Sequence, residues 1–157
     1  MAFQFSNVRL FASQINFTDC KRALVGLGID VRSVLKAMTF NNARLVVFRV
    51  GRVICSRFVS FGTILSARLK ARIESAKAVQ FEFVNKHPNE NVTIAETTTG
   101  HTITIDHDAH SIDCDCPDIG SIELNGIQIC KHTIATMKSF FDISSLSKML
   151  EWYNQGW

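Results

Sequence analysis

Three cysteines and one histidine fall into two short pairs in the C-terminal half of the chain. The first pair is Cys114 and Cys116, and the second is Cys130 and His132. Thiolate sulfur and imidazole nitrogen are preferred zinc ligands, and four of them form a closed tetrahedral site. The pattern C-x-C-x13-C-x-H therefore predicts a structural Zn²⁺ site. Such sites contribute on the order of 10 kcal/mol of folding free energy in small zinc peptides.

The alternative interpretation is that these cysteines are small apolar residues of the core, which is a common role of free cysteine. The chain holds five cysteines, an odd number that suits a metal site better than a disulfide framework. Thiolates must stay reduced to hold zinc. We therefore expect an intracellular protein, in the cytoplasm or nucleoid or in the nucleus.

The length of 157 residues suits one domain, or a small zinc module with an N-terminal extension. A hydrophobic content of 46% with 20% charged residues is typical of a globular chain with a sizeable core. The sequence lacks an uncharged apolar run of about 18 residues, so neither a transmembrane helix nor a membrane partner is expected.

Positive charge is concentrated in the first half of the chain. Residues 1–80 hold thirteen Lys and Arg against three Asp and Glu, a net charge of +10. Residues 81–157 hold four Lys against eleven Asp and Glu, a net charge of −7. A basic half suggests a polyanion such as nucleic acid, held by phosphate contacts. The alternative is that the basic surface docks against the acidic half or against a protein partner.

The N-terminal region, residues 1–78, is predicted to be a basic mixture of helices and strands. A short strand is expected within residues 3–17, and a short helix over Cys20–Val25 with Thr18 or Asp19 as its N-cap. Helical spacing of apolar residues predicts another short helix over Val31–Met38 and an amphipathic helix over 62–77. Between these helices, β-branched and aromatic residues around a Gly-Arg turn predict a hairpin over 44–61.

The basic residues of this region are the candidate nucleic-acid contacts. Arginines alternate with aromatic residues along the hairpin, a pattern that recurs on nucleic-acid-binding strands. The interpretation favoured for the hairpin is simpler, namely that it is half buried and its arginines face water. The basic face of the following helix is the better candidate for phosphate contacts. The full candidate set is Arg68, Lys70, Arg72, Lys77, Arg49 and Arg52.

The C-terminal region, residues 79–157, is predicted to begin with an antiparallel meander. Four short alternating segments around 79–83, 92–96, 102–105 and 111–113 are separated by turns. His107 and His110 flank the last turn, where they could bind a metal together with Asp108, but we interpret them as turn residues. Between the two ligand pairs, Asn125-Gly126 predicts a hairpin with a type I′ turn. A helix over 133–141 and a last helix capped by Ser144 or Ser145 complete the prediction.

The predicted fold class is therefore α+β: a small antiparallel meander with a zinc-linked hairpin and C-terminal helices, preceded by the basic region. The run from Val79 to Phe141 resembles the SWIM zinc finger, in which strand pairs lead to C-x-C, a variable connector and a C-x-H that opens a helix. The resemblance implies that Cys114, Cys116, Cys130 and His132 are the zinc ligands. SWIM domains occur in chromatin-remodelling-type ATPases, Mutator-like transposases, a kinase regulator and small partners of recombinases.

The resemblance implies binding rather than catalysis. Because four protein ligands leave no open position on the ion, we expect no enzymatic activity from the zinc site. The predicted function is a DNA-binding module in recombination, repair, transposition or transcription, with non-specific phosphate contacts. The alternative is a protein–protein adaptor in a recombination or repair complex, in which the zinc fold presents apolar edges or the C-terminal tryptophans, Trp152 and Trp157, to its partner.

Overall fold

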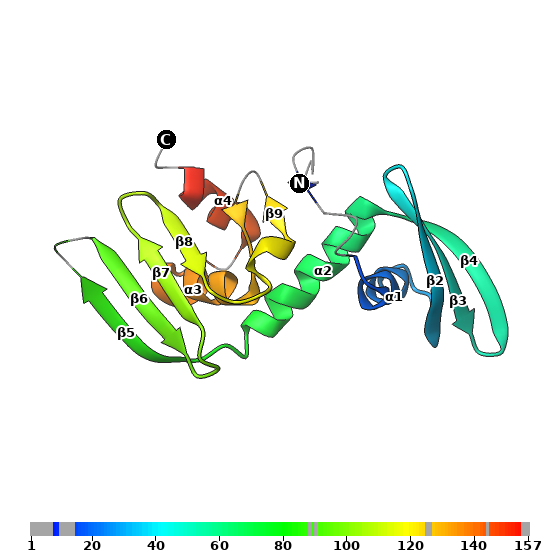
Figure 1. The fold of residues 1–157 in the computed structure, drawn as a ribbon, viewed down its shortest axis with the longest axis horizontal. Coiled ribbons are helices and arrows are strands. Elements are labelled where there is room, and N and C mark those ends of the chain that lie inside the picture. The colour runs from blue at the N-terminus through cyan, green and yellow to red at the C-terminus, as the bar shows by residue number, and fades with distance from the viewer. Residues whose placement is uncertain are drawn as a thin grey trace. The chain divides into compact units, whose positions relative to one another are not determined.

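The chain forms two compact units, Met1–Ala71 and Arg72–Trp157, and the division between them falls inside the helix α2 (Phe61–Ala76). A computed structural model describes residues 8–9, 15–87, 89, 91–124, 127–143 and 145–154 (Figure 1). Each unit contains helices and its own antiparallel sheet, so the predicted α+β class is confirmed.

The first described elements are β1 (Val8–Arg9) and α1 (Phe17–Gly26). The segment in which a strand was predicted is residues 3–17. Of these, residues 3–7 and 10–14 lie outside the described residues. The N-cap of α1 is Asn16, whose side chain accepts a hydrogen bond from the Asp19 N–H at 3.0 Å. The Asp19 carboxylate accepts the Asn16 N–H at 3.1 Å in return. The prediction of Thr18 or Asp19 as the cap was wrong, because Asp19 is the second member of this capping box.

The sheet of the first unit has the order β2-β3-β4, formed by β2 (Ser33–Phe40), β3 (Ala43–Val50) and β4 (Val53–Ser60). The predicted hairpin is confirmed as β3 and β4. The helix predicted over Val31–Met38 was wrong, because this segment forms β2 and pairs with β3. A register shift between Val34 and Lys36 breaks the period-two alternation of β2, so its apolar residues fall at helix-like intervals.

One face of this sheet packs against α1 (Figure 1). The buried residues of the unit include Leu24 of α1, Val46 and Phe48 of β3, Val59 of β4 and Ile64 of α2. Because successive strand residues point to opposite faces, these positions fix which side chains point away from the core. The helix predicted over 62–77 is confirmed as α2.

The sheet of the second unit is the predicted meander, with each strand paired to the next in sequence. Its strands are β5 (Phe81–His87), β6 (Val92–Thr97), β7 (Thr102–Asp106) and β8 (Ser111–Cys114). Ile105 lies opposite Ile112 and Ile103 lies opposite Cys114, and all four are buried. Burial therefore alternates along β6, β7 and β8 as the sequence pattern predicts, whereas β5 has a register shift between Phe81 and Phe83 and is mostly exposed.

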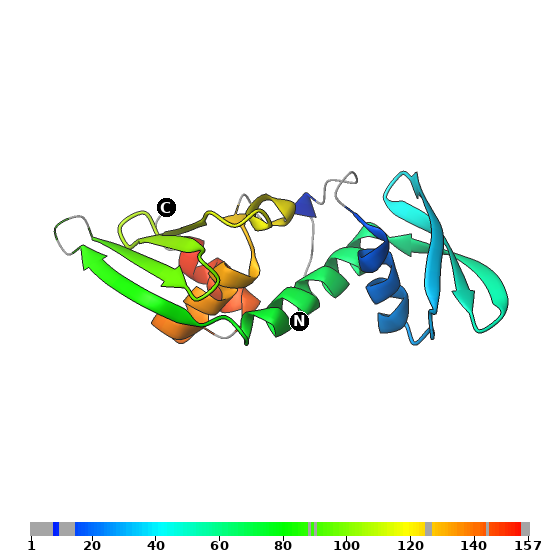
Figure 2. The ribbon, with the colours of Figure 1, turned by 60° about the horizontal axis from the view of Figure 1, so that its bottom comes forward.

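The elements after β8 follow one another in the predicted order, a hairpin and then two helices. After a 3₁₀ helix (Ile119–Ser121), β9 (Glu123–Leu124) pairs antiparallel with β10 (Ile127–Gln128), which confirms the connector hairpin. The Asn125-Gly126 tip lies outside the described residues. The helix α3 (Lys131–Phe141) packs against the meander, with the ring centres of Phe140 and Phe81 5.1 Å apart (Figure 2).

The last helix is α4 (Leu146–Asn154). The Ser145 hydroxyl accepts the Lys148 N–H at 3.3 Å, so Ser145 caps the helix as predicted. Trp152 lies between Phe141 and His110, with ring-centre distances of 4.7 and 5.1 Å. None of the helices in the described part of the chain combines the length and the apolar character needed to cross a membrane.

Candidate metal centre

The first ligand pair lies where β8 ends. Cys114 is the last residue of that strand and Cys116 follows two positions later, so both side chains point to the same, buried side. Asp115 between them is exposed, and its carboxylate accepts the Thr102 N–H at 3.0 Å. Strand alternation therefore separates the two thiols from the intervening acid, and the negative charge of Asp115 points outward.

The second ligand pair opens α3. Cys130 is the N-cap, and its Sγ accepts the Thr133 N–H at 3.4 Å while its own N–H donates to Thr133 Oγ1 at 3.0 Å. His132 lies in the first turn and is buried. A cysteine sulfur thus occupies the position where a serine or aspartate usually caps a helix, and the positive end of the helix dipole favours the thiolate.

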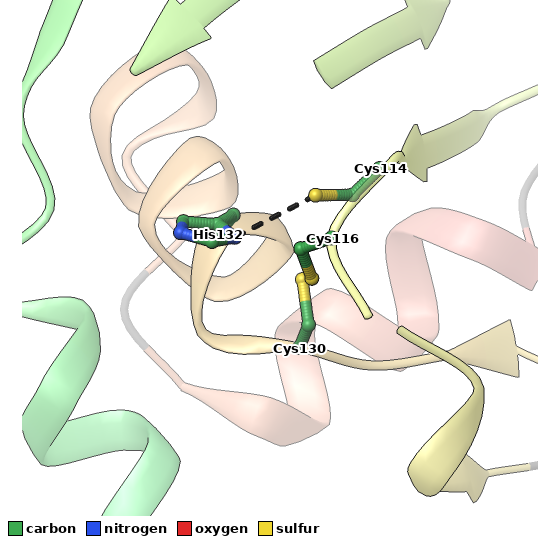
Figure 3. Close-up of side chains that lie close together, drawn as sticks. All are labelled: Cys114, Cys116, Cys130 and His132. Atoms are coloured by element: carbon green, nitrogen blue, oxygen red, sulfur yellow. Dashed lines mark hydrogen bonds between the residues drawn. The ribbon is translucent and has the colours of Figure 1, made fainter. Parts of the chain in front are cut away.

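The two pairs meet in one buried cluster (Figure 3). The three Sγ atoms and one ring nitrogen all lie within 4.8 Å of one another. Cys114 Sγ is 3.6 Å from His132 Nδ1. Zinc bond lengths of about 2.3 Å to sulfur and 2.0–2.1 Å to nitrogen give a tetrahedral S···N edge of about 3.6 Å. The tetrad is therefore consistent with a bound metal ion such as zinc, with Nδ1 as the nitrogen ligand.

The protonation pattern of the tetrad also suits a metal. The hydrogen bond with the Cys114 thiol, opposed by burial and aided by the Thr133 N–H, lowers the pKa of Cys130 to about 5. The same hydrogen bond, with burial, raises the pKa of Cys114, and burial raises that of Cys116. Burial lowers the pKa of His132, which keeps the imidazole neutral. Zinc binding would therefore displace the protons of Cys114 and Cys116.

His101, which belongs to none of the sequence motifs, lies beside the cluster. Its ring centre is 4.7 Å from that of His132, and its Nδ1 is 3.3 Å from the Asp115 carboxylate. The Nε2 atom of His132 is buried and has no hydrogen-bond partner among the described residues. His101 lies one residue before a predicted strand. No sequence pattern indicated its contact with Asp115, because the two residues are fourteen positions apart in the chain.

Arg72 supports the cluster rather than facing solvent. Its Nη1 donates to the main-chain carbonyl of Asp118 at 3.3 Å and also to that of Ile129. Asp118 follows the first ligand pair by two residues, and Ile129 directly precedes Cys130. One guanidinium thus joins the two ends of the connector.

Arg68, the first of the candidate phosphate contacts, is only 8% exposed. Its Nη2 and Nε donate to the carboxylate of Asp19, itself 2% exposed, at 2.6 and 3.2 Å. A guanidinium held in a buried ion pair is not available to phosphate groups. Arg68 and Arg72 are therefore structural residues, contrary to the solvent-facing role expected from the helical pattern.

The other candidate basic residues have different surroundings. Lys77 is exposed and forms an ion pair with Glu74 at 2.6 Å. Lys70 and Arg52 are exposed, and Arg49 is partly buried. His107 and His110 lie in the turn between β7 and β8, as predicted.

None of the family models, curated proteins and solved structures with which the chain was compared matches it. The resemblance to the SWIM zinc finger therefore rests on the ligand pattern and on the elements that carry it.

Proposed function

We propose that this chain is a zinc-stabilised DNA-binding module of the SWIM type. The observation that carries the proposal is the buried tetrad, which joins the end of β8 to the start of α3. All four coordination positions of a tetrahedral ion would be filled by protein, as in structural rather than catalytic zinc sites. The ion would hold the fold of the second unit, and binding rather than catalysis would be the function of the protein.

The basic residues that remain available support a DNA face on the first unit. Residues 33–60, which span β2–β4, carry five Lys and Arg and no Asp or Glu. Lys70, Arg52 and Arg57 are exposed. The acidic charge of residues 81–157 makes the zinc-binding part of the chain a poor surface for a polyanion. We therefore assign phosphate contacts to the first unit.

A salt series tests this proposal. Affinity of the full-length, zinc-loaded protein for duplex DNA should fall steeply with salt, because each phosphate contact adds about 0.9 to the log–log slope. Joint replacement of Arg52, Arg57 and Lys70 by alanine should lower that slope by about two to three units. Binding to all DNA sequences should weaken to the same extent, because phosphate contacts carry no base information. Replacement of Lys86, Lys138 and Lys148 in the second unit is the matched control and should leave the slope unchanged.

The adaptor alternative makes the opposite prediction. It expects little DNA binding at physiological salt, and loss of a protein partner when Trp152 or the tetrad is changed. Trp152, one of the proposed partner contacts, packs against Phe141 and His110 within the second unit. Its indole is thus used inside the fold, which favours the DNA-binding proposal over an adaptor that relies on this side chain.

A further inference from the structure

The outer face of the β2–β4 sheet, the one turned away from α1, is apolar and aromatic. On β2, Ala37 packs against the core, so Met38 and Phe40 point outward. On β4, Val59 is buried, and Phe58 points outward opposite Leu45 of β3. Phe40 and Phe58 are 48% and 60% exposed, and their ring centres lie 5.7 Å apart in an edge-on arrangement. Two aromatic side chains therefore share an open sheet surface.

Positive charge lies farther along the strands on the same face. Lys36 lies opposite Val47, and Arg49 lies opposite Ile54, which is 59% exposed. Arg49 follows the buried Phe48, so it points away from the core, and its Nε has no hydrogen-bond partner among the described residues. Arg52 is exposed in the adjoining turn. The face thus combines stacking surfaces with cations at the opposite end of the strands.

The charge of this sheet decides between possible occupants. A second copy of the chain would bring together two outer faces that each carry Lys36 and Arg49, with Arg52 in the adjoining turn, while residues 33–60 hold no Asp or Glu. Such like-charge contact is unfavourable. A duplex presents phosphates but keeps its bases stacked inside. A single strand offers both phosphates and open base faces, the pair of groups that cations and aromatic rings bind on nucleic-acid platforms.

We infer that the outer face of the β2–β4 sheet binds single-stranded nucleic acid, with Phe40 and Phe58 stacking on bases and Lys36, Arg49 and Arg52 contacting phosphates. This inference rests on the proposed nucleic-acid-binding function and specifies the form of nucleic acid. It also gives a role to rings that contribute little to the core. Because stacking accepts any base, the preference is for strandedness rather than for sequence.

Fluorescence anisotropy with the full-length, zinc-loaded protein tests the inference, using a labelled oligodeoxythymidylate and a duplex of equal length. The single strand should bind more tightly than the duplex. The double variant Phe40→Leu, Phe58→Leu should weaken single-strand binding about tenfold or more, because each lost base–ring stack removes a favourable contact. The matching double Tyr variant keeps both rings and should bind like the unmodified protein. Phe83→Leu, a 51% exposed ring on β5, is the control and should change nothing.

The outcomes separate this inference from the proposed function. Tighter duplex binding, or equal affinity of the Leu and Tyr variants, would overturn the single-strand inference and leave DNA binding by the first unit intact. Absence of binding to either probe at physiological salt would overturn both, and a protein partner lost in the Leu variant would then identify a protein-docking face. Thermal melting of each variant checks the fold, which should survive because both rings are about half exposed.

Discussion

Cys130 has two roles in the second unit, since its sulfur caps α3 and belongs to the metal tetrad. A thiolate at a helix N-terminus is favoured by the helix dipole, and the same sulfur would bind the ion. Loss of this side chain would therefore remove the cap together with one of the four residues that would hold the ion. Cys55, in contrast, is a partly buried cysteine of β4 in the other unit.

The Cys130→Ala variant should lose zinc, whereas Cys55→Ala should keep it. Purified under reducing conditions, the unmodified protein is expected to hold about one Zn²⁺ per chain. The reason is that the four residues of the tetrad fill the coordination sphere of one tetrahedral ion. Metal content measured by atomic emission checks the ligand assignment. Zinc at full occupancy in Cys130→Ala would show that the tetrad is not the binding site.

Asp19 joins two interactions of the first unit, the capping box of α1 and the buried ion pair with Arg68. Asp19→Ala should destabilise this unit by about 3–5 kcal/mol, because it leaves the buried guanidinium without its counter-charge. Urea unfolding followed by circular dichroism measures the loss. The control is Arg22→Ala, which removes an exposed arginine 3.8 Å from the same carboxylate and should cost about 0–1 kcal/mol. Equal effects of the two substitutions would contradict a structural role for the buried pair.

The sequence was sufficient to identify the four residues of the tetrad but not the contacts of the arginines. The short spacing within each Cys/His pair is visible in the sequence and indicates a metal site by itself. The strand and the helix that hold the two pairs were also predicted. The role of Arg68 depends on Asp19, forty-nine residues earlier. Helical periodicity cannot show that a charged side chain will meet an acid from a distant helix, so Arg68 was assigned to solvent.

At the scale of elements, the connector between the ligand pairs is held at both ends. Arg72 of α2 binds the carbonyls of Asp118 and Ile129, next to the two halves of the tetrad. Arg72→Met should weaken zinc affinity roughly tenfold, the lower range for residues that orient metal ligands. Lys70→Met on the same helix is the matched control. Competition with a chromogenic chelator measures both, and unchanged affinity in Arg72→Met would mean that the connector needs no such support.

The tip of the connector hairpin should accept extra residues. β9 ends at Leu124 and β10 begins at Ile127, so an insertion between Asn125 and Gly126 lengthens a two-residue loop. Each doubling of loop length costs only about 0.6 kcal/mol. A short Gly-Ser insertion should therefore leave zinc content unchanged. The same insertion after Asp115 is the destructive control, because it separates Cys114 from Cys116.

The wrong prediction of a helix at β2 shows how a local irregularity can conceal a strand. β2 would alternate with period two if its register with β3 were regular, but the shift between Val34 and Lys36 breaks the pattern. Pairing with β3 supplies hydrogen-bond partners for its backbone, and such pairing is invisible in a linear pattern. The hairpin and the meander were predicted correctly, because their turn residues and the alternation of β6–β8 are visible in the sequence itself.

At the scale of the whole molecule, the ligand tetrad belongs entirely to the second compact unit. Removal of zinc by a chelator should therefore increase hydrogen exchange in β8 and α3, which the ion would join, and leave β2–β4 protected. Mass spectrometry with peptide resolution distinguishes the two units. Equal loss of protection in β2–β4 would show that the ion stabilises the whole chain rather than one unit.

The pairing of the meander has a consequence for the order of folding. Each of β5–β8 pairs with its neighbour in sequence, and contacts of short sequence separation form fast. Cys114 and Cys116 are then in place at the end of a formed sheet before α3 is attached. Cys130 and His132 complete the site from a segment that emerges later during synthesis, so a growing chain would meet the ion with half of its ligands already arranged.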